Sequence, residues 1–95
     1  MNKNKTDHFV YIIECQNGSY YTGYTTDVER RYQEHCKGTP KCRYTQSFPP
    51  KKLVAAWRFD SKQEAMQVEY QIKQYSRQQK MALIKKSSNS TTQQP

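Results

Sequence analysis

The chain has 95 residues, the length of one small domain with a limited core, so a functional site is expected at the surface and not in a deep cavity. Sixteen Lys and Arg against eight Asp and Glu give a net charge of +8, which favours a polyanionic partner, nucleic acid above all. An acidic membrane surface would suit the same charge, but no apolar run approaches the length of a membrane span.

The N-terminus and the cysteines bear on localisation. Residues 1–7 lack the apolar core of a secretory signal and are predicted to be flexible. Cys15, Cys36 and Cys42 are odd in number and far apart, which is typical of free thiols in a reducing cytosol. Because these cysteines form no C-x-x-C pair, no zinc site is predicted beside His35. We expect a soluble, unexported, cytoplasmic protein.

The first predicted element is a β-hairpin. Residues 8–15 are apolar at nearly every position and rich in β-branched side chains, which indicates a central strand covered on both faces. Residues 16–18, Gln-Asn-Gly, form a turn signal, and the tyrosine- and threonine-rich residues 19–24 are predicted to form the second strand.

The type of turn decides which tyrosines share a face. A two-residue turn at Asn17-Gly18 would place Tyr21 on the opposite side of the sheet from Tyr11. A type I turn followed by a left-handed Gly18 shifts the register by one residue and places Tyr11, Tyr21 and Gly23 on one face. We favour the bulged turn, and we expect Gly23 to leave an open floor for a ligand opposite Tyr11.

A helix is predicted to start at the capping box Thr26-Asp27-Val28-Glu29 and to end at Gly38 and Pro40. Its predicted buried stripe consists of Val28, Tyr32 and Cys36. Arg31 and His35 flank this stripe one turn apart, while Arg30 points away. Arg31 therefore has two interpretations, a site residue or a surface residue whose stem covers the core edge.

Residues 39–52 are predicted to form a loop that interleaves basic and aromatic residues. The members are Lys41, Arg43, Lys51 and Lys52 around Tyr44 and Phe48. This composition suits a flexible nucleic-acid strand, because cations meet phosphates and rings stack on bases. An ordinary solvated loop is the alternative. Residues 53–59 then read as a third strand.

Two more helices are predicted, the first from the capping box at Ser61 to about Tyr75. Its core face is predicted to comprise Ala65, Val68, Ile72 and Tyr75. Glu69 sits at the shoulder of that face, although an exposed Glu69–Lys73 pair is the simpler interpretation. A third capping pattern at Ser76 opens a short helix to about Ile84, and the polar run from Ser87 is predicted to be disordered.

The ordered set of motifs resembles the GIY-YIG nuclease domain in its small single-domain bacterial form. The resemblance is carried by Phe9-Val10-Tyr11, by Tyr21-Thr22-Gly23 with Arg31 eight residues later, by Lys41-Cys42-Arg43-Tyr44-Thr45 and by Glu69 on the later helix. It covers about residues 8–84. Phe9 and Thr22 depart from the family's Gly and Ile at positions without a chemical role. The expected organisation is a flexible segment 1–7, a domain over 8–85 and a polar tail over 86–95.

The resemblance implies an α+β fold, with a three-stranded antiparallel sheet flanked by about three helices, that hydrolyses DNA with one divalent ion, Mg²⁺ or Mn²⁺. It implies that Tyr21 acts on the attacking water beside Tyr11, that Arg31 stabilises the phosphate and that Glu69 is the sole protein ligand of the metal. His35 and Tyr24 are expected to line the same cleft. Residues expected to contact nucleic acid are Tyr24, Lys41, Arg43, Tyr44, Lys51, Lys73, Arg77 and Lys80.

We expect no separate DNA-binding domain, so the expected substrate is flexible, branched or single-stranded DNA, with RNA possible and a role in repair or recombination. The alternatives are a nucleic-acid-binding module that does not cut and an adaptor for a repair protein.

Overall fold

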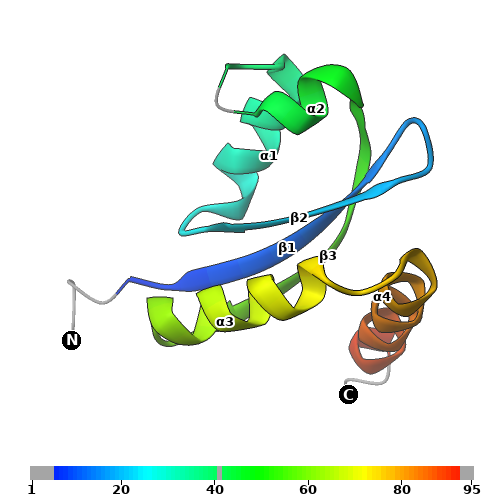
Figure 1. Cartoon of the computed structure of the whole chain (residues 1–95). Helices are drawn as coiled ribbons and strands as arrows, with labels where there is room; N and C mark the ends of the chain where they lie inside the picture. The colour runs from blue at the N-terminus through cyan, green and yellow to red at the C-terminus, as the bar shows by residue number, and fades with distance from the viewer. Residues whose placement is uncertain (1–5, 41, 93–95) are drawn as a thin grey trace.

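The structure, a computed structural model, describes residues 6–40 and 42–92 and contains a three-stranded sheet with four helices (Figure 1). The elements are β1 (His8–Cys15), β2 (Tyr20–Thr25), α1 (Val28–Lys37), α2 (Arg43–Ser47), β3 (Pro50–Phe59), α3 (Lys62–Lys73) and α4 (Arg77–Thr92). The strand order is β2-β1-β3 and both pairings are antiparallel. The predicted α+β architecture is therefore confirmed.

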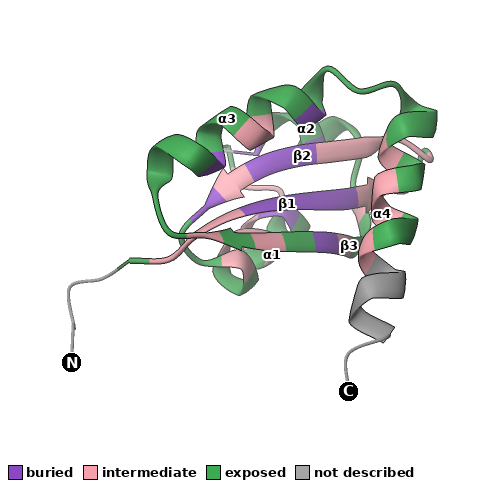
Figure 2. Ribbon diagram, turned by 90° about the horizontal axis from the view of Figure 1, so that it is seen from below, coloured by how far each residue is buried: buried purple, intermediate pink, exposed green. Residues whose placement is uncertain are grey.

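The sheet separates two cores, with α1 and α2 on one side and α3 and α4 on the other (Figure 1). On the α3 side, Val10 and Ile12 of β1 pack against Ala65 and Ile72. On the α1 side, alternate residues of β1, beginning with Tyr11, form a second cluster. Because β1 is central, it is buried on both faces, as its apolar sequence predicted (Figure 2).

The hairpin has the predicted bulged turn. Gly18 has a left-handed φ of 87°, and its N–H donates to the carbonyl of Cys15 at 2.9 Å. Tyr11 pairs with Gly23 and Ile13 with Tyr21 across the two strands. Tyr11 and Tyr21 therefore lie on the same face of the sheet, as the bulged register requires.

Helix α1 differs from its prediction at its start and on its buried side. Asp27, not Thr26, is the N-cap, because its carboxylate accepts from the Arg30 N–H at 3.1 Å. Gly38 ends the helix with φ 69°, as predicted. The predicted stripe is wrong at Cys36, which is exposed, while His35 is only 1% exposed. Hydrogen bonds from the His35 ring to the sheet and to α2 turn this neighbouring position inward.

The predicted loop over residues 39–52 contains a short helix and the first residues of a strand. Residues 43–47 form the short helix α2, stabilised by the buried Thr45, whose hydroxyl donates to the Cys42 carbonyl at 3.1 Å. Strand β3 begins at Pro50 and not at Leu53. A proline is tolerated there because it is the first residue of an edge strand.

Helices α3 and α4 have the predicted caps but different ends. The Ser61 hydroxyl accepts from the Glu64 N–H, and Ser76 and Gln79 cap each other reciprocally. Helix α3 ends at Lys73, so Tyr75 is 38% exposed and not part of the core. Helix α4 continues past Ile84 to Thr92 through the polar run predicted to be disordered, because no glycine or proline interrupts it.

Other predictions concern the termini and the thiols. Residues 93–95 of the predicted tail and residues 1–5 of the predicted flexible segment lie outside the described residues. All three cysteines are free, as predicted. Across residues 6–40 and 42–92, the helices are too short or too polar to cross a membrane.

Candidate functional site

Tyr11 occupies the centre of the α1 side of the sheet. Its side chain is 1% exposed and its ring lies across Gly23 of β2. A Cβ atom on Gly23 would meet the Tyr11 hydroxyl and would lie 2.6 Å from its Cζ atom. The predicted open floor for a ligand is therefore wrong. The missing side chain of Gly23 makes room for the Tyr11 ring itself.

A buried chain of hydrogen bonds joins β1, α1 and α2. The Tyr11 hydroxyl lies 2.9 Å from His35 Nε2, and His35 Nδ1 lies 2.8 Å from Thr45 Oγ1. The Thr45 hydroxyl donates its proton to the Cys42 carbonyl, so towards His35 it accepts. His35 Nδ1 therefore carries the ring proton, and the lone pair of Nε2 accepts from Tyr11.

Burial keeps both members of the Tyr11–His35 pair neutral. Burial, together with the nearby Arg31 charge, lowers the pKa of His35 to about 4. Burial also raises the pKa of Tyr11 well above its ordinary value, and a hydrogen bond with Arg31 offsets only part of this rise. Near neutral pH the pair is thus a phenol donating to an uncharged imidazole.

Tyr21 lies on top of this buried pair, between the sheet and α2. Its ring centroid is 5.1 Å from that of His35, 5.3 Å from that of Tyr44 and 6.3 Å from that of Tyr11. These contacts fix the ring, which is half-buried. Its hydroxyl forms no hydrogen bond with any residue in the described part of the chain, so it is available to water or a substrate.

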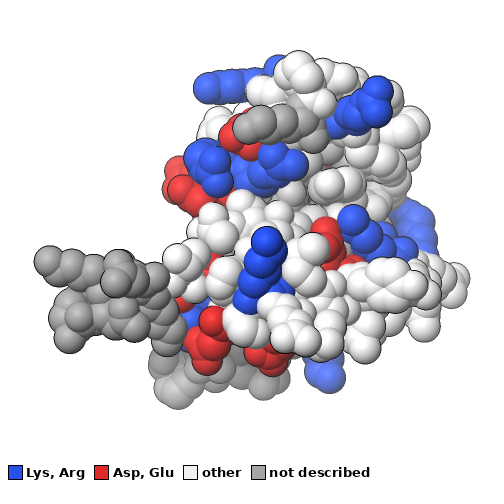
Figure 3. Space-filling view, turned by 60° about the vertical axis from the view of Figure 1, so that its left-hand side comes forward, with Lys and Arg blue, Asp and Glu red and all other residues white. Residues whose placement is uncertain are grey.

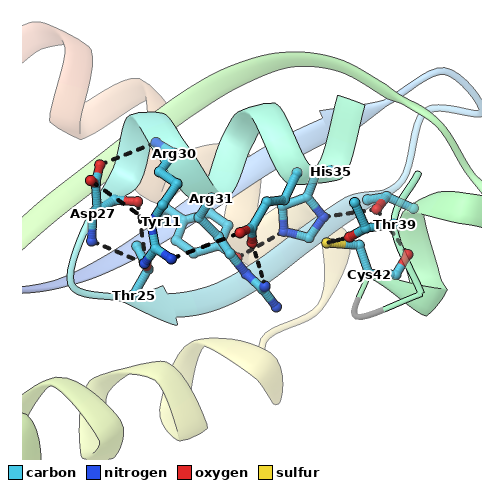
Figure 4. Close-up of polar contacts among 10 residues, drawn as sticks. Tyr11, Thr25, Asp27, Arg30, Arg31, His35, Thr39 and Cys42 are labelled. Atoms are coloured by element: carbon cyan, nitrogen blue, oxygen red, sulfur yellow. Dashed lines mark hydrogen bonds and ion pairs between the residues drawn. The ribbon is translucent and has the colours of Figure 1, made fainter. Parts of the chain in front are cut away.

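Arg31 brings a cation to the same face from α1 (Figure 4). Its side chain is 23% exposed, and Nη1 lies 2.8 Å from the Glu34 carboxylate. Arg30, on the same helix, is 58% exposed and reaches Asp27 and Glu34 from outside. Arg31 is therefore the inward-facing member of the arginine pair, as predicted, but its guanidinium is already paired with the Glu34 carboxylate.

Glu69 lies on α3, which packs against the other face of the sheet. Its carboxylate is 13% exposed and pairs with Lys73 at 3.2 Å. Among the described residues, no group of three His, Cys, Asp or Glu side chains converges as a metal cage. The structure therefore joins Tyr11, Tyr21, Arg31 and His35 by direct contacts, and it places Glu69 on a helix that packs against the sheet from the other side.

Tyr24 does not belong to this site. It lies three residues after Tyr21 on β2, so its side chain points to the α3 side, where it packs with the core. Its hydroxyl bonds to His8 Nδ1 at 2.7 Å, and the two rings stack. The expectation that Tyr24 and His35 line one cleft is wrong, because strand alternation separates them.

The expected nucleic-acid contacts are spread over the surface. Lys41 lies outside the described residues. Arg43 and Tyr44 are exposed on α2, while Lys51 pairs loosely with Glu14 at 4.0 Å. Arg77 and Lys80 lie together on α4 beside the hairpin turn. Figure 3 shows one face on which Lys and Arg form separate groups with Asp and Glu between them, not one continuous basic stripe.

Three residues of the site were missed by sequence reasoning. Thr45 fixes the His35 tautomer, Glu34 holds Arg31, and Ser19 accepts from the Tyr44 hydroxyl at 2.7 Å. The spacing of Arg31 and Glu34, three residues apart on one helix, was a usable signal. Thr45 and Ser19 gave none, because their partners are distant in the sequence.

The chain is similar over most of its length to other proteins. It is 51% identical over 78 residues to the UPF0213 protein BH0048 of Halalkalibacterium halodurans, covering 82% of each chain. It is 57% identical over 77 residues to a UPF0213 protein of Halobacterium salinarum, covering 81% of this chain and 99% of that one. These relatives are small proteins of one domain.

Solved structures and a family profile show the same relationship to these proteins. The NMR structure of the Bacillus halodurans UPF0213 protein BH0048 matches with a TM-score of 0.54 at 51% identity over 83% of each chain. That of the protein EF2693 from E. faecalis matches with a TM-score of 0.58 at 34% identity over 90% of each. The profile of the GIY-YIG catalytic domain matches residues 7–82. The chain thus belongs to the GIY-YIG catalytic domain family, a nuclease-like family.

Proposed function

We propose that this protein is an endonuclease that hydrolyses phosphodiester bonds, acting on flexible, branched or single-stranded DNA in repair or recombination. The observation that carries the proposal is Tyr21, whose ring is fixed by His35, Tyr44 and Tyr11 while its hydroxyl has no partner among the described residues. A hydroxyl held rigidly but left unbonded suits a group that acts on an external water.

Tyr21 and Arg31 are the groups of the site that substrate can reach. Tyr21 orients the attacking water and relays its proton, passing its own phenolic proton to a phosphate oxygen as it takes up the proton of the water. Arg31 stabilises the negative charge that develops on the phosphate, which requires its guanidinium to exchange the Glu34 carboxylate for phosphate oxygens. The arginine fork suits both partners, because carboxylate and phosphate present similar oxygen pairs.

The hydrogen-bonded side chains of Tyr11, His35 and Thr45 form a network that positions these two residues. Tyr11 and His35 are each 1% exposed, so neither touches a substrate directly. Their rings support the ring of Tyr21, and Tyr11 also bonds to Arg31. The network therefore fixes the two reactive side chains relative to each other.

A divalent cation is part of the proposal, and Glu69 is the residue that would hold it. A lone carboxylate is a suitable protein ligand for Mg²⁺, which keeps several waters and takes phosphate oxygens as further ligands. When bound, such an ion would lower the pKa of its water and neutralise phosphate charge. Lys73, which pairs with Glu69 at 3.2 Å, would have to release the carboxylate.

One observation favours a second function, a nucleic-acid-binding module that does not cut. Both charged groups proposed for catalysis are already paired, Arg31 with Glu34 and Glu69 with Lys73. If substrate does not displace these partners, the domain would bind without hydrolysis.

An incision assay separates the two functions. Wild type is incubated with labelled single-stranded, flapped and branched DNA and with RNA, in Mg²⁺ or Mn²⁺, beside Arg31→Ala, Glu69→Ala and the matched control Arg30→Ala. We expect the first two variants to lose about 100-fold or more in rate with binding retained, and Arg30→Ala to stay within about twofold. Equal cleavage by all four proteins would indicate a contaminant, and binding without cleavage by wild type would establish the second function.

A further inference from the structure

A second concave surface lies away from the Tyr21 site, between the hairpin turn and α4. It has a volume of about 190 Å³ and is lined by Ser19, Tyr20, Tyr75, Arg77 and Lys80. Two of these five side chains are cations and none is an acid. A pocket of this composition selects for a negatively charged ligand.

Arg77 and Lys80 are held in place by backbone carbonyls at the hairpin, and each keeps N–H groups that can bind a ligand. Arg77 Nε donates to the Gly18 carbonyl at 3.0 Å, and the guanidinium lies 5.5 Å from the centroid of the Tyr20 ring. Lys80 Nζ donates to the Tyr20 carbonyl at 3.4 Å. Within the described residues neither cation has a carboxylate partner, so several N–H groups remain unbonded.

The surroundings of Lys80 point in the same direction. Lys80 is partly buried, and burial together with the charge of Lys73 lowers its pKa. Because burial is the larger cause, an anion bound in the pocket beside Lys80 would offset the cost of keeping this ammonium charged.

We propose that this pocket binds a phosphate group between Arg77 and Lys80. Arginine and lysine side chains anchored by carbonyl oxygens offer the charge-assisted donors that phosphate takes. Tyr75 at the rim is 38% exposed and borders a second hollow with Tyr70, which is 68% exposed, so flanking bases have rings on which to stack.

If the proposed function holds, the phosphate belongs to the DNA strand beside the cleaved bond. Ser19 lines the pocket and also accepts from Tyr44, which stacks on Tyr21. The hairpin turn therefore connects the pocket to the Tyr21 site. A DNA strand that passes around the β2 edge of the sheet would contact both. The pocket is then a second anchor for the strand and not a part of the cleavage chemistry.

The test uses the full ¹⁵N-labelled chain and two probes, inorganic phosphate and an oligothymidylate without terminal phosphates. We expect either probe to shift the backbone amides of Ser19, Arg77 and Lys80. Lys80→Gln is expected to weaken oligonucleotide binding about tenfold and to reduce the salt dependence of binding by about one phosphate contact. The control Lys62→Gln, at the start of α3, removes the same charge and is expected to change affinity less than twofold.

The outcomes distinguish a failure of the proposed phosphate pocket from a failure of the proposed function. Shifts with phosphate alone would support the pocket while contradicting the proposed nucleic-acid substrate. Oligonucleotide binding and cleavage that Lys80→Gln leaves unchanged would overturn the pocket and leave the proposed function standing. Amide shifts with neither probe, or equal losses in Lys80→Gln and Lys62→Gln, would also overturn it.

Discussion

The same strands form both faces of the sheet, but the side chains buried on the two faces differ in kind. On the α3 side, Val10 and Ile12 pack into an apolar core. On the α1 side, the intervening Tyr11 begins a polar network through His35 to Thr45 that is as fully buried. Buried polar groups are costly unless every one is bonded, and in this network each is. The difference indicates that the buried cluster on the α1 side positions reactive side chains, while the apolar cluster on the α3 side mainly stabilises the fold.

Gly23→Ala should produce the largest effect, because the new methyl group would clash with the Tyr11 ring on the network side. We expect about 1–3 kcal/mol of lost stability and about 100-fold slower cleavage, measured by urea unfolding and by the incision assay. Gly38→Ala is the control: its φ of 69° is strained for alanine, but its Cβ would meet nothing nearer than 3.9 Å. It should cost about 1 kcal/mol and leave cleavage intact.

Thr45→Val should have the next largest effect, because it removes the acceptor for His35 Nδ1 while keeping the shape of the side chain. A buried N–H left unbonded is expected to cost about 1–3 kcal/mol of unfolding free energy. Cleavage should slow about tenfold as the His35 tautomer is released. NMR of the imidazole nitrogens reports the tautomer directly: an Nε2–H form in wild type would contradict the assignment, and an unchanged Nδ1–H form in the variant would show that Thr45 does not fix the tautomer.

Acid should weaken the network side through His35. Its pKa is about 4 when folded against 6.5 ordinarily, so between these values the unfolded chain takes up a proton that the folded chain does not. The contribution of His35 is therefore complete above about pH 6.5 and is lost as the pH falls to about 4, on the order of 3 kcal/mol. Urea unfolding of wild type and His35→Gln across this range measures it, and an NMR midpoint near 6.5 for His35 would contradict it.

Thr22→Val should have the smallest effect and the opposite sign. Thr22 is 2% exposed on β2, and its hydroxyl has no hydrogen-bond partner among the described residues. Replacing it with a methyl group of similar size is expected to raise the unfolding free energy by up to about 1 kcal/mol without changing cleavage. A loss of stability would show that the hydroxyl is bonded, for example through a water.

Local signals predicted the three strands, the end of α1 at Gly38 and the starts of α3 and α4. Gly18 fixed the hairpin register, and the caps at Ser61 and Ser76 act within a few residues. The failures involve contacts across the chain. His35 is buried in place of Cys36 because Tyr11 and Thr45 bond to it from other elements.

The candidate site was predictable to the same extent. The bulged register placed Tyr11 and Tyr21 together, and helical spacing placed Arg31 and His35 beside them. The expectation for Tyr24 came from the resemblance alone and is wrong, because the same register places its side chain on the other face of the sheet. The position of Glu69 relative to this face depends on how α3 packs, which no local pattern encodes.

The most direct test of the two-face account compares Tyr21→Phe with Tyr24→Phe. Both variants remove one tyrosine hydroxyl from β2, the first on the network side and the second on the α3 side, where it bonds to His8. With binding and folding checked for each, we predict that Tyr21→Phe loses about 100-fold or more in cleavage rate while Tyr24→Phe stays within about twofold. Equal rates for the two variants, or a larger loss in Tyr24→Phe, would contradict the assignment of the reactive tyrosine to the α1 side.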